Sequence, residues 1–183
     1  MDFTTTQLQA IKQAIITDQT ILDSFNAGNH GIAIDLLNAP SSFIVWRTFT
    51  LSSDIQNAIS WTNLTPVNPT GTSTIVDSNF LLACQGKQFN LQLLLQGNGF
   101  STVATGKANI RAGFQDCLTA IPSGTAGALK SGGWPAVQLA MQRPATVAEK
   151  SMATGVGTSV SPGILTWEGT LPYTGILNDA MGS

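Results

Sequence analysis

The stretch RPATVAEKSMATGVGTSVSPGILTWEGTLPY, residues 143–173, decides the expected fold because its pattern changes twice within one run. Its first part predicts a helix that Pro144 opens, since proline loses no useful donor in the first turn of a helix. The glycines that follow predict a loop. Residues 164–169 then alternate with the period of a strand. We therefore expect residues 154–183 to form a glycine-rich loop, a β-arm and a C-terminal tail.

Apolar side chains at helical spacing recur through most of the remaining chain. Capping residues predict where two helices begin, at Thr4 to Thr6 for the first and at Asp18 for the second. Residues 77–96 predict the longest helix. A further helix is expected from about residue 126 to 143, interrupted by a pair of glycines. Most of the chain is thus predicted to be helical.

One segment outside this stretch has the composition of a strand. Residues 43–49, FIVWRTF, are β-branched or aromatic almost throughout, which suits a pleated, half-buried surface. Arg47 among these apolar neighbours is either an edge residue whose charged end reaches water or an ion-pair donor to another subunit. The sequence therefore predicts an α+β, predominantly helical fold. It would have a helical body, a small β element near 43–49 and 164–169, and an extended C-terminal arm.

Length and composition bound the class of protein. A chain of 183 residues predicts a single domain over residues 1–183. Only 10% of the residues are charged, against about 25% in ordinary globular chains. The formal net charge of −2 gives no basic stripe for nucleic acid. A surface with few charges relies little on repulsion to stay monomeric, which favours a subunit that packs against copies or partners. The polar start and the lack of a long apolar run predict no signal peptide and no membrane span.

Residues that could carry chemistry are few and scattered. His30 is the only histidine, falls in a predicted loop and has no partner motif for nucleophilic catalysis. Glu149 and Glu168 lie close in sequence, but we interpret them as surface charges rather than as an acid–base pair. Cys84 and Cys117 fall in apolar helical patterns and are predicted to be small buried side chains, with a disulfide left open. We predict no enzyme activity, no cofactor and no metal site.

Four segments carry a resemblance to a known family. They are VWRTFTLSSDIQNAISWTNL (45–64), NIRAGFQDCLTAI (109–121), MQRPATVAEKSMATGVGT (141–158) and SPGILTWEGTLPYTGI (161–176). In this order they resemble a family of tailed-phage and prophage structural proteins. The chain departs from the family pattern at Gln142, where a basic residue is usual, and at Gly132-Gly133, where an unbroken helix is expected.

The resemblance implies a virion component that is assembled in the bacterial host cytoplasm. Together with the helical, neutral and glycine-punctuated sequence, it predicts a head–tail connector (adaptor) that forms a ring under the portal. Its partners would be copies of itself, the portal and other neck or tail proteins. DNA would pass through the lumen only as cargo, and no membrane would take part. The alternative is a capsid decoration protein or a tail-tube or terminator component, although tube subunits consist mostly of strands.

The predicted interface toward copies or partners draws on charged and aromatic residues of these segments, since such residues often anchor interfaces. The six residues are Arg47, Arg111, Arg143, Trp167, Glu168 and Tyr173.

Overall fold

Regular structure covers most of the residues that the computed structural model describes, which are 3–68, 78–96, 99, 101–124, 127–173 and 175–183. Helices predominate among them, and the strands are short and form two-stranded sheets. These features confirm the predicted α+β, predominantly helical fold. Contacts divide the chain into two compact units. Unit 1 contains Met1–Trp46 and Gln142–Ser183, and unit 2 contains Arg47–Met141. The expectation of one domain over residues 1–183 did not distinguish these units.

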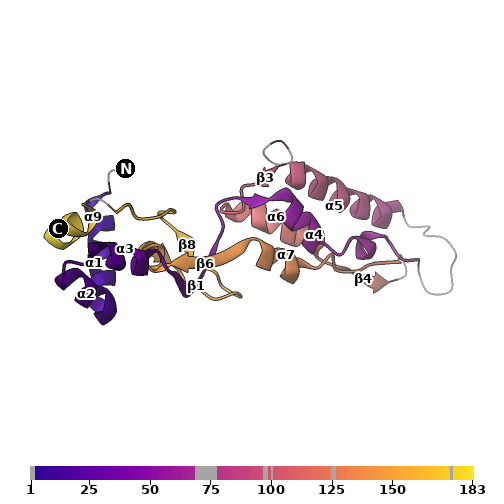
Figure 1. Ribbon diagram of the computed structural model, residues 1–183. Helices are drawn as coiled ribbons and strands as arrows, with labels where there is room; N and C mark the ends of the chain where they lie inside the picture. The colour runs from indigo at the N-terminus through magenta and orange to yellow at the C-terminus, as the bar shows by residue number, and fades with distance from the viewer. Residues whose placement is uncertain (1–2, 69–77, 97–98, 100, 125–126, 174) are drawn as a thin grey trace. The chain divides into compact units, whose positions relative to one another are not determined.

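Unit 1 is built from the two ends of the chain (Figure 1). Its helices are α1 (Thr5–Thr17), α2 (Gln19–Asn26), α3 (His30–Asn38), α8 (Val147–Met152) and α9 (Ile176–Gly182). Its strands are β1 (Pro40–Trp46), β6 (Gln142–Thr146), β7 (Ala153–Thr154) and β8 (Ile164–Leu165). β1 pairs with β6 and β7 pairs with β8, both antiparallel. The chain leaves unit 1 at the end of β1 and returns on the adjacent strand, with Trp46 opposite Gln142.

The core of unit 1 is apolar and local caps set where its first helices begin. Thr4 and Gln7 form a capping box at α1, as the sequence predicts. The Asp18 carboxylate accepts hydrogen bonds from two backbone N–H groups at the start of α2, which confirms the second predicted cap. α1 and α2 pack with α3, α8, α9 and Leu171 around one apolar core. Its buried residues include Ile11, Ile15, Ile34, Leu37, Ala148, Leu171 and Ile176.

Unit 2 is mainly helical (Figure 1). Its helices are α4 (Ser52–Ala58), the 3-10 helix η1 (Trp61–Leu64), α5 (Ser78–Gln96), α6 (Ala108–Leu118) and α7 (Trp134–Ala140). Its strands are β2 (Thr50–Leu51), β3 (Thr102–Val103), β4 (Ile121–Gly124) and β5 (Gly127–Leu129). β2 pairs with β3 and β4 pairs with β5. α5 is the longest helix described and confirms the prediction for residues 77–96, of which residue 77 lies outside the described residues.

Two predicted helices are replaced in part by strands. Pro144, expected to open a helix, lies instead in β6 (Gln142–Thr146), opposite Ile44. The helix starts only after Thr146, whose side chain forms a capping box with Glu149. Residues 127–129, within the helix expected from 126 to 143, form β5 instead.

The helix that does form in this second region begins only after a glycine. Gly133 caps α7 in the left-handed conformation (φ +88°). Residues 130–133, which end in this glycine, separate α7 from β5.

The predicted strands are displaced or shorter than expected. β1 spans Pro40–Trp46 rather than 43–49, and Arg47 lies beyond it. The pairing ends there because its partner strand begins at Gln142. β8 keeps only Ile164–Leu165 of the predicted 164–169. After an irregular segment the chain ends in α9, whose residues Ile176, Leu177 and Ala180 are buried in the core of unit 1.

The glycine-rich loop of unit 1 lies directly on β1. The backbone N–H of Ile44 donates to the carbonyl oxygen of Gly157 at 2.8 Å. The N–H of Gly163 donates to the carbonyl oxygen of Ile44, also at 2.8 Å. A Cβ atom added at Gly157 would lie 2.1 Å from the ring of Phe43, and one at Gly163 would lie 2.3 Å from it. Glycine is therefore required at both positions so that the loop backbone can approach this ring.

Replacing Gly157 with alanine is expected to destabilise the protein by about 2 kcal/mol or more, because the residue has φ +73° and the new methyl group would overlap the Phe43 ring. Urea unfolding of the full chain measures the change. Gly31→Ala is the matched control, since nothing lies within 4 Å of its added Cβ. It should change the free energy of unfolding by less than about 1 kcal/mol. Equal effects of the two substitutions would contradict this role of the loop.

Candidate functional site

The six residues predicted at an interface fall in both units. Arg143, Trp167, Glu168 and Tyr173 belong to unit 1, and Arg47 and Arg111 belong to unit 2. The structure brings Arg143 and Glu168 together, and Arg111, Trp167 and Tyr173 also have partners within their own units. Their contact with a neighbouring subunit stays a prediction.

Arg143 on β6 is the centre of an ionic cluster in unit 1. Its Nη1 and Nη2 donate to Oε2 and Oε1 of Glu149 at 2.7 and 2.8 Å, a two-pronged contact of guanidinium and carboxylate. Nη2 also donates to Oε1 of Glu168 at 2.8 Å. The pKa of Arg143 is raised, chiefly because its guanidinium is hydrogen-bonded to Glu149. The cluster thus joins β6, α8 and the segment after β8.

Glu149 is the buried member of this cluster, with only 2% of its surface exposed. Its carboxylate also accepts hydrogen bonds from the backbone N–H groups of Thr146 at 2.9 Å and Gly169 at 3.1 Å. Burial on its own would raise the pKa of Glu149, but the hydrogen bonds from Arg143 and from these two N–H groups lower the pKa overall. The group therefore stays ionised, as suits a structural anion rather than a proton donor at neutral pH.

The interpretation of Glu149 as a solvated surface charge is wrong, because the carboxylate is buried. The signal that identifies it is the pattern Thr146-x-x-Glu149, a capping box in which the glutamate folds back onto the start of its own helix. Glu168, in contrast, is 37% exposed by its side chain and agrees with the surface-charge interpretation.

Arg111 on α6 has a comparable bracing role in unit 2. Its Nη1 donates to the carbonyl oxygens of Thr105 and Gly106, each at 2.8 Å. The hydroxyl of Thr105 in turn donates to the carbonyl oxygen of Arg47 at 2.9 Å. Burial lowers the pKa of Arg111. Thr105 thus links the two predicted arginines: its carbonyl oxygen binds the side chain of Arg111, and its hydroxyl binds the backbone of Arg47.

The aromatic residues near the ends of the chain contact their own unit. The ring of Trp167 lies 5.4 Å from that of Phe3, centre to centre. The hydroxyl of Tyr173 donates to the carboxylate of Asp35. His30, expected in a loop, is the first residue of α3, and its ring stacks on Phe25 at 5.0 Å.

A pocket in unit 2 opens between α4, η1 and α5 and encloses about 420 Å³. Its floor consists of buried leucine side chains, Leu64, Leu91 and Leu95. Its rim consists of exposed residues, Gln56, Trp61, Thr65, Gln88 and Gln92. None of these eight lining residues is charged. The volume lies within the usual range for small-molecule sites, about 300–1,000 Å³.

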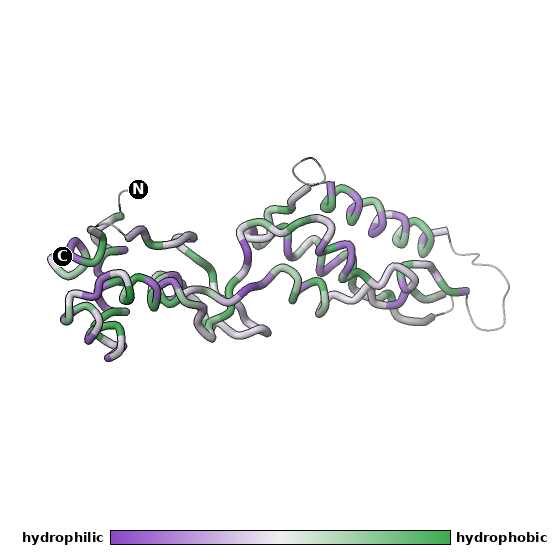
Figure 2. The backbone as a smooth tube through the Cα atoms, viewed as in Figure 1, coloured by the Kyte–Doolittle hydropathy of each residue, from purple (hydrophilic) through white to green (hydrophobic). Residues whose placement is uncertain are grey.

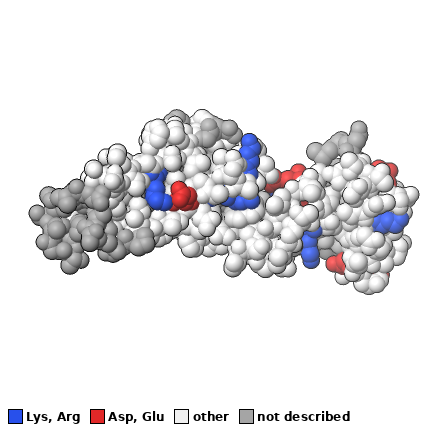
Figure 3. All heavy atoms as spheres, turned by 180° about the vertical axis from the view of Figure 1, so that it is seen from behind, with Lys and Arg blue, Asp and Glu red and all other residues white. Residues whose placement is uncertain are grey.

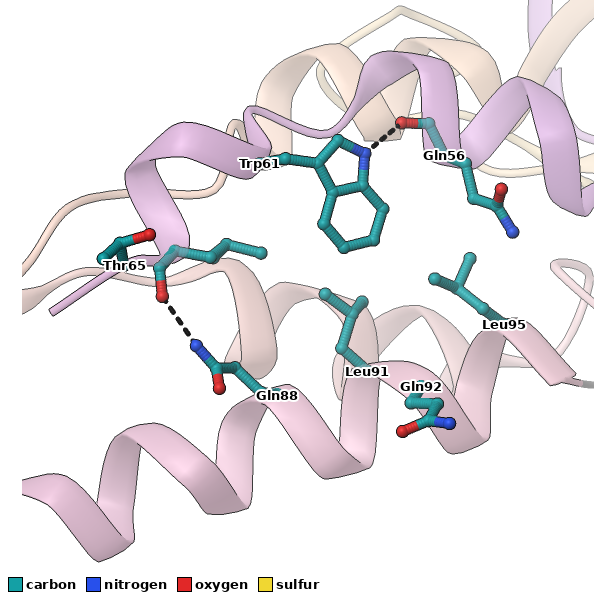
Figure 4. A pocket seen from close by; sticks show the side chains of 8 residues that line it. Gln56, Trp61, Thr65, Gln88, Leu91, Gln92 and Leu95 are labelled. Atoms are coloured by element: carbon teal, nitrogen blue, oxygen red, sulfur yellow. Dashed lines mark hydrogen bonds between the residues drawn. The ribbon is translucent and has the colours of Figure 1, made fainter.

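The wall of the pocket is held in place by two hydrogen bonds (Figure 4). The indole Nε1–H of Trp61 donates to the backbone carbonyl oxygen of Gln56 at 2.9 Å. The side-chain amide of Gln88 donates to the backbone carbonyl oxygen of Leu64 at 2.8 Å. Figure 4 shows the indole pointing from the start of η1 toward Leu91 on α5. The indole is 50% exposed, so one of its surfaces is available to a ligand.

No pattern in the sequence predicts this pocket. Its lining comes from two segments, 56–65 and 88–95, which only the packing of α4 and η1 against α5 brings together. The cysteines are as predicted: Cys84 and Cys117 are buried and free, and burial raises the pKa of both thiols.

Comparison of the chain with models of protein families, with curated proteins and with solved structures gives no match. Across the described part of the chain, no three His, Cys, Asp or Glu residues are grouped as a metal site would require. The described helices are all too short or too polar to cross a membrane.

Replacing Arg143 with alanine is expected to cost about 3–5 kcal/mol, because it leaves the buried carboxylate of Glu149 without its counter-charge. Glu168→Gln is the control, because Glu168 binds the same guanidinium from an exposed position. Loss of this ion pair should lower the free energy of unfolding by only about 0–1 kcal/mol. Chemical denaturation measures both. A loss below about 1 kcal/mol for Arg143→Ala would contradict the assignment of Glu149 as a buried anion.

The lowered pKa of Glu149 also predicts how the free energy of unfolding depends on pH. Its pKa is lowered from 4.5 on folding, so its contribution is present above that value and is lost as the pH falls through the lower pKa of the folded state. The advantage of the wild-type chain over Glu149→Gln in free energy of unfolding should therefore shrink as the solution is acidified below pH 4.5. Parallel unfolding curves at a series of pH values measure it, and a constant difference throughout would refute the linkage.

Proposed function

We propose that this protein is a structural subunit of a tailed-phage virion, a head–tail connector (adaptor) that assembles with copies of itself into a ring under the portal. The proposal draws first on the four ordered segments that resemble phage and prophage structural proteins. The arrangement of side chains supports the proposal further. Arg143, Glu149 and Glu168, which lie in two of these segments, bind one another within unit 1, so contacts with other subunits would be made by other residues.

The observation that carries the proposal is a stripe of apolar side chains on the outer face of α5. Leu82, Phe89 and Leu93 are 63%, 60% and 49% exposed. Together with Gly86 they recur at intervals of four, three and four residues, which places them on one side of the helix. Figure 2 shows polar and apolar residues alternating along α5. The buried residues of this helix are Phe80, Cys84, Leu91 and Leu95.

A stripe of this kind suits contact with another protein. The charge nearest to it on α5 is Lys87, whose Nζ lies 3.5 Å from a carboxylate oxygen of Asp116. The lysine is therefore neutralised within its own unit. A partner can then cover the stripe of Leu82, Gly86, Phe89 and Leu93 without burying an unpaired charge.

The sparse charge of the molecule also fits a place along the path of DNA. The chain has 8 basic and 10 acidic residues among 183. Figure 3 shows one face on which Lys, Arg, Asp and Glu atoms are few among those of uncharged residues. Basic residues that neutralise phosphates hold DNA by releasing counterions, so a surface with few of them would let DNA slide through a lumen.

Two measurements test the proposal together. Light scattering on the purified chain should give the mass of a closed oligomer, and quantitative mass spectrometry should find the protein in finished phage particles. Leu82→Ser combined with Phe89→Ser should weaken self-association at least about tenfold, since apolar anchors dominate interfaces. Ala83→Ser, also exposed on α5 but about 100° around the helix from Leu82, is the matched control and should leave the mass unchanged. A stable monomer that is absent from particles would overturn the proposal.

A further inference from the structure

We infer that the pocket between α4, η1 and α5 binds a neutral saccharide, with one pyranose ring lying against the indole of Trp61. This inference is independent of the proposed place in a phage particle, because it rests on the pocket alone.

The lining of the pocket sets the charge of its ligand. All eight lining residues are uncharged. A charged ligand would leave water for a cavity that offers no counter-charge, at a large cost in free energy. The ligand is therefore neutral.

The rim of the pocket requires that the ligand be polar at its edge. Gln56, Gln88 and Gln92 each carry an amide with donors and an acceptor, and Thr65 adds a hydroxyl. A purely apolar occupant would cover these groups without pairing them. Hydroxyl groups both donate and accept, so a ligand with hydroxyls around its edge can pair with every group of this rim.

The indole and the floor require that the ligand also have an apolar face. Trp61 is half exposed, and its Nε1–H is fixed by the carbonyl oxygen of Gln56, so the ring is oriented before a ligand arrives. The buried Leu91 and Leu95 continue the apolar surface below it. A pyranose has C–H groups on one face and hydroxyls at its edge, which is the combination that this pocket accommodates.

A peptide segment suits the pocket less well. Every lining element is helical except at Thr65, which directly follows η1. The carbonyl oxygens of Gln56 and Leu64 already accept hydrogen bonds from Trp61 and Gln88, and the lining contains no strand edge for a peptide backbone to extend. The pocket offers separate side-chain amides instead, which match separate hydroxyls.

The test is a titration of the full ¹⁵N-labelled chain with maltohexaose, followed by the tryptophan indole N–H signals. The chain has four tryptophans, and Trp61→Phe assigns the signal of Trp61. We expect a saturable shift of this signal and of the side-chain amides of Gln56 and Gln92. Hexagalacturonate, which has the same length but a carboxylate on each ring, should bind at least about tenfold more weakly.

Two variants and a peptide complete the design. Trp61→Ala and Gln92→Glu should each weaken maltohexaose binding at least about tenfold, and Trp134→Phe in the same unit should not. A peptide of residues 155–163, neutral and rich in small side chains, tests the other class of ligand. The inference fails if maltohexaose leaves the Trp61 signal unmoved, if the charged oligomer binds equally well, or if only the peptide shifts that signal.

Discussion

A buried carboxylate, that of Glu149, is the constraint on which unit 1 depends. An ionised group with only 2% of its surface exposed is tolerated only where its charge is paired and its oxygens are hydrogen-bonded. Arg143 supplies the charge, and the N–H groups of Thr146 and Gly169 supply further bonds. The four residues come from β6, the start of α8 and the segment after β8. Satisfying one anion therefore joins three stretches of chain.

Features set by short-range interactions could be predicted from the sequence, and those set by long-range pairing could not. The caps at Thr4 and Asp18 and the helix over 78–96 depend on neighbouring residues, and they formed as expected. Pro144 was expected to open a helix, but its segment pairs with β1, about a hundred residues earlier in the chain. A pattern of neighbouring residues does not predict pairing between strands so far apart in the chain. The pocket was missed for the same reason, since Trp61 and Leu91 meet only through tertiary packing.

The charged residues and the exposed apolar residues have separate roles in this chain. Arg143 and Arg111 are occupied by partners inside their own units, where they hold strands, helices and loops together. The side chains exposed on α5 are uncharged, as at Phe89 and Gln92, while the nearby pocket is lined by amides, an indole and leucines. Such a surface binds through shape, apolar contact and neutral hydrogen bonds. The proposed assembly and the inferred saccharide site both use this neutral chemistry, at different places in unit 2.

A double-mutant cycle on Arg143 and Glu149 tests the central claim most directly, because it isolates the interaction between the two side chains from their separate packing. Arg143→Met, Glu149→Gln and the double variant would each be unfolded by denaturant and compared with the wild-type chain. If Glu149 is the buried anion that organises unit 1, the double variant should be more stable than the sum of the single losses predicts, by about 2 kcal/mol or more. Losses that add to within about 0.5 kcal/mol would contradict the account.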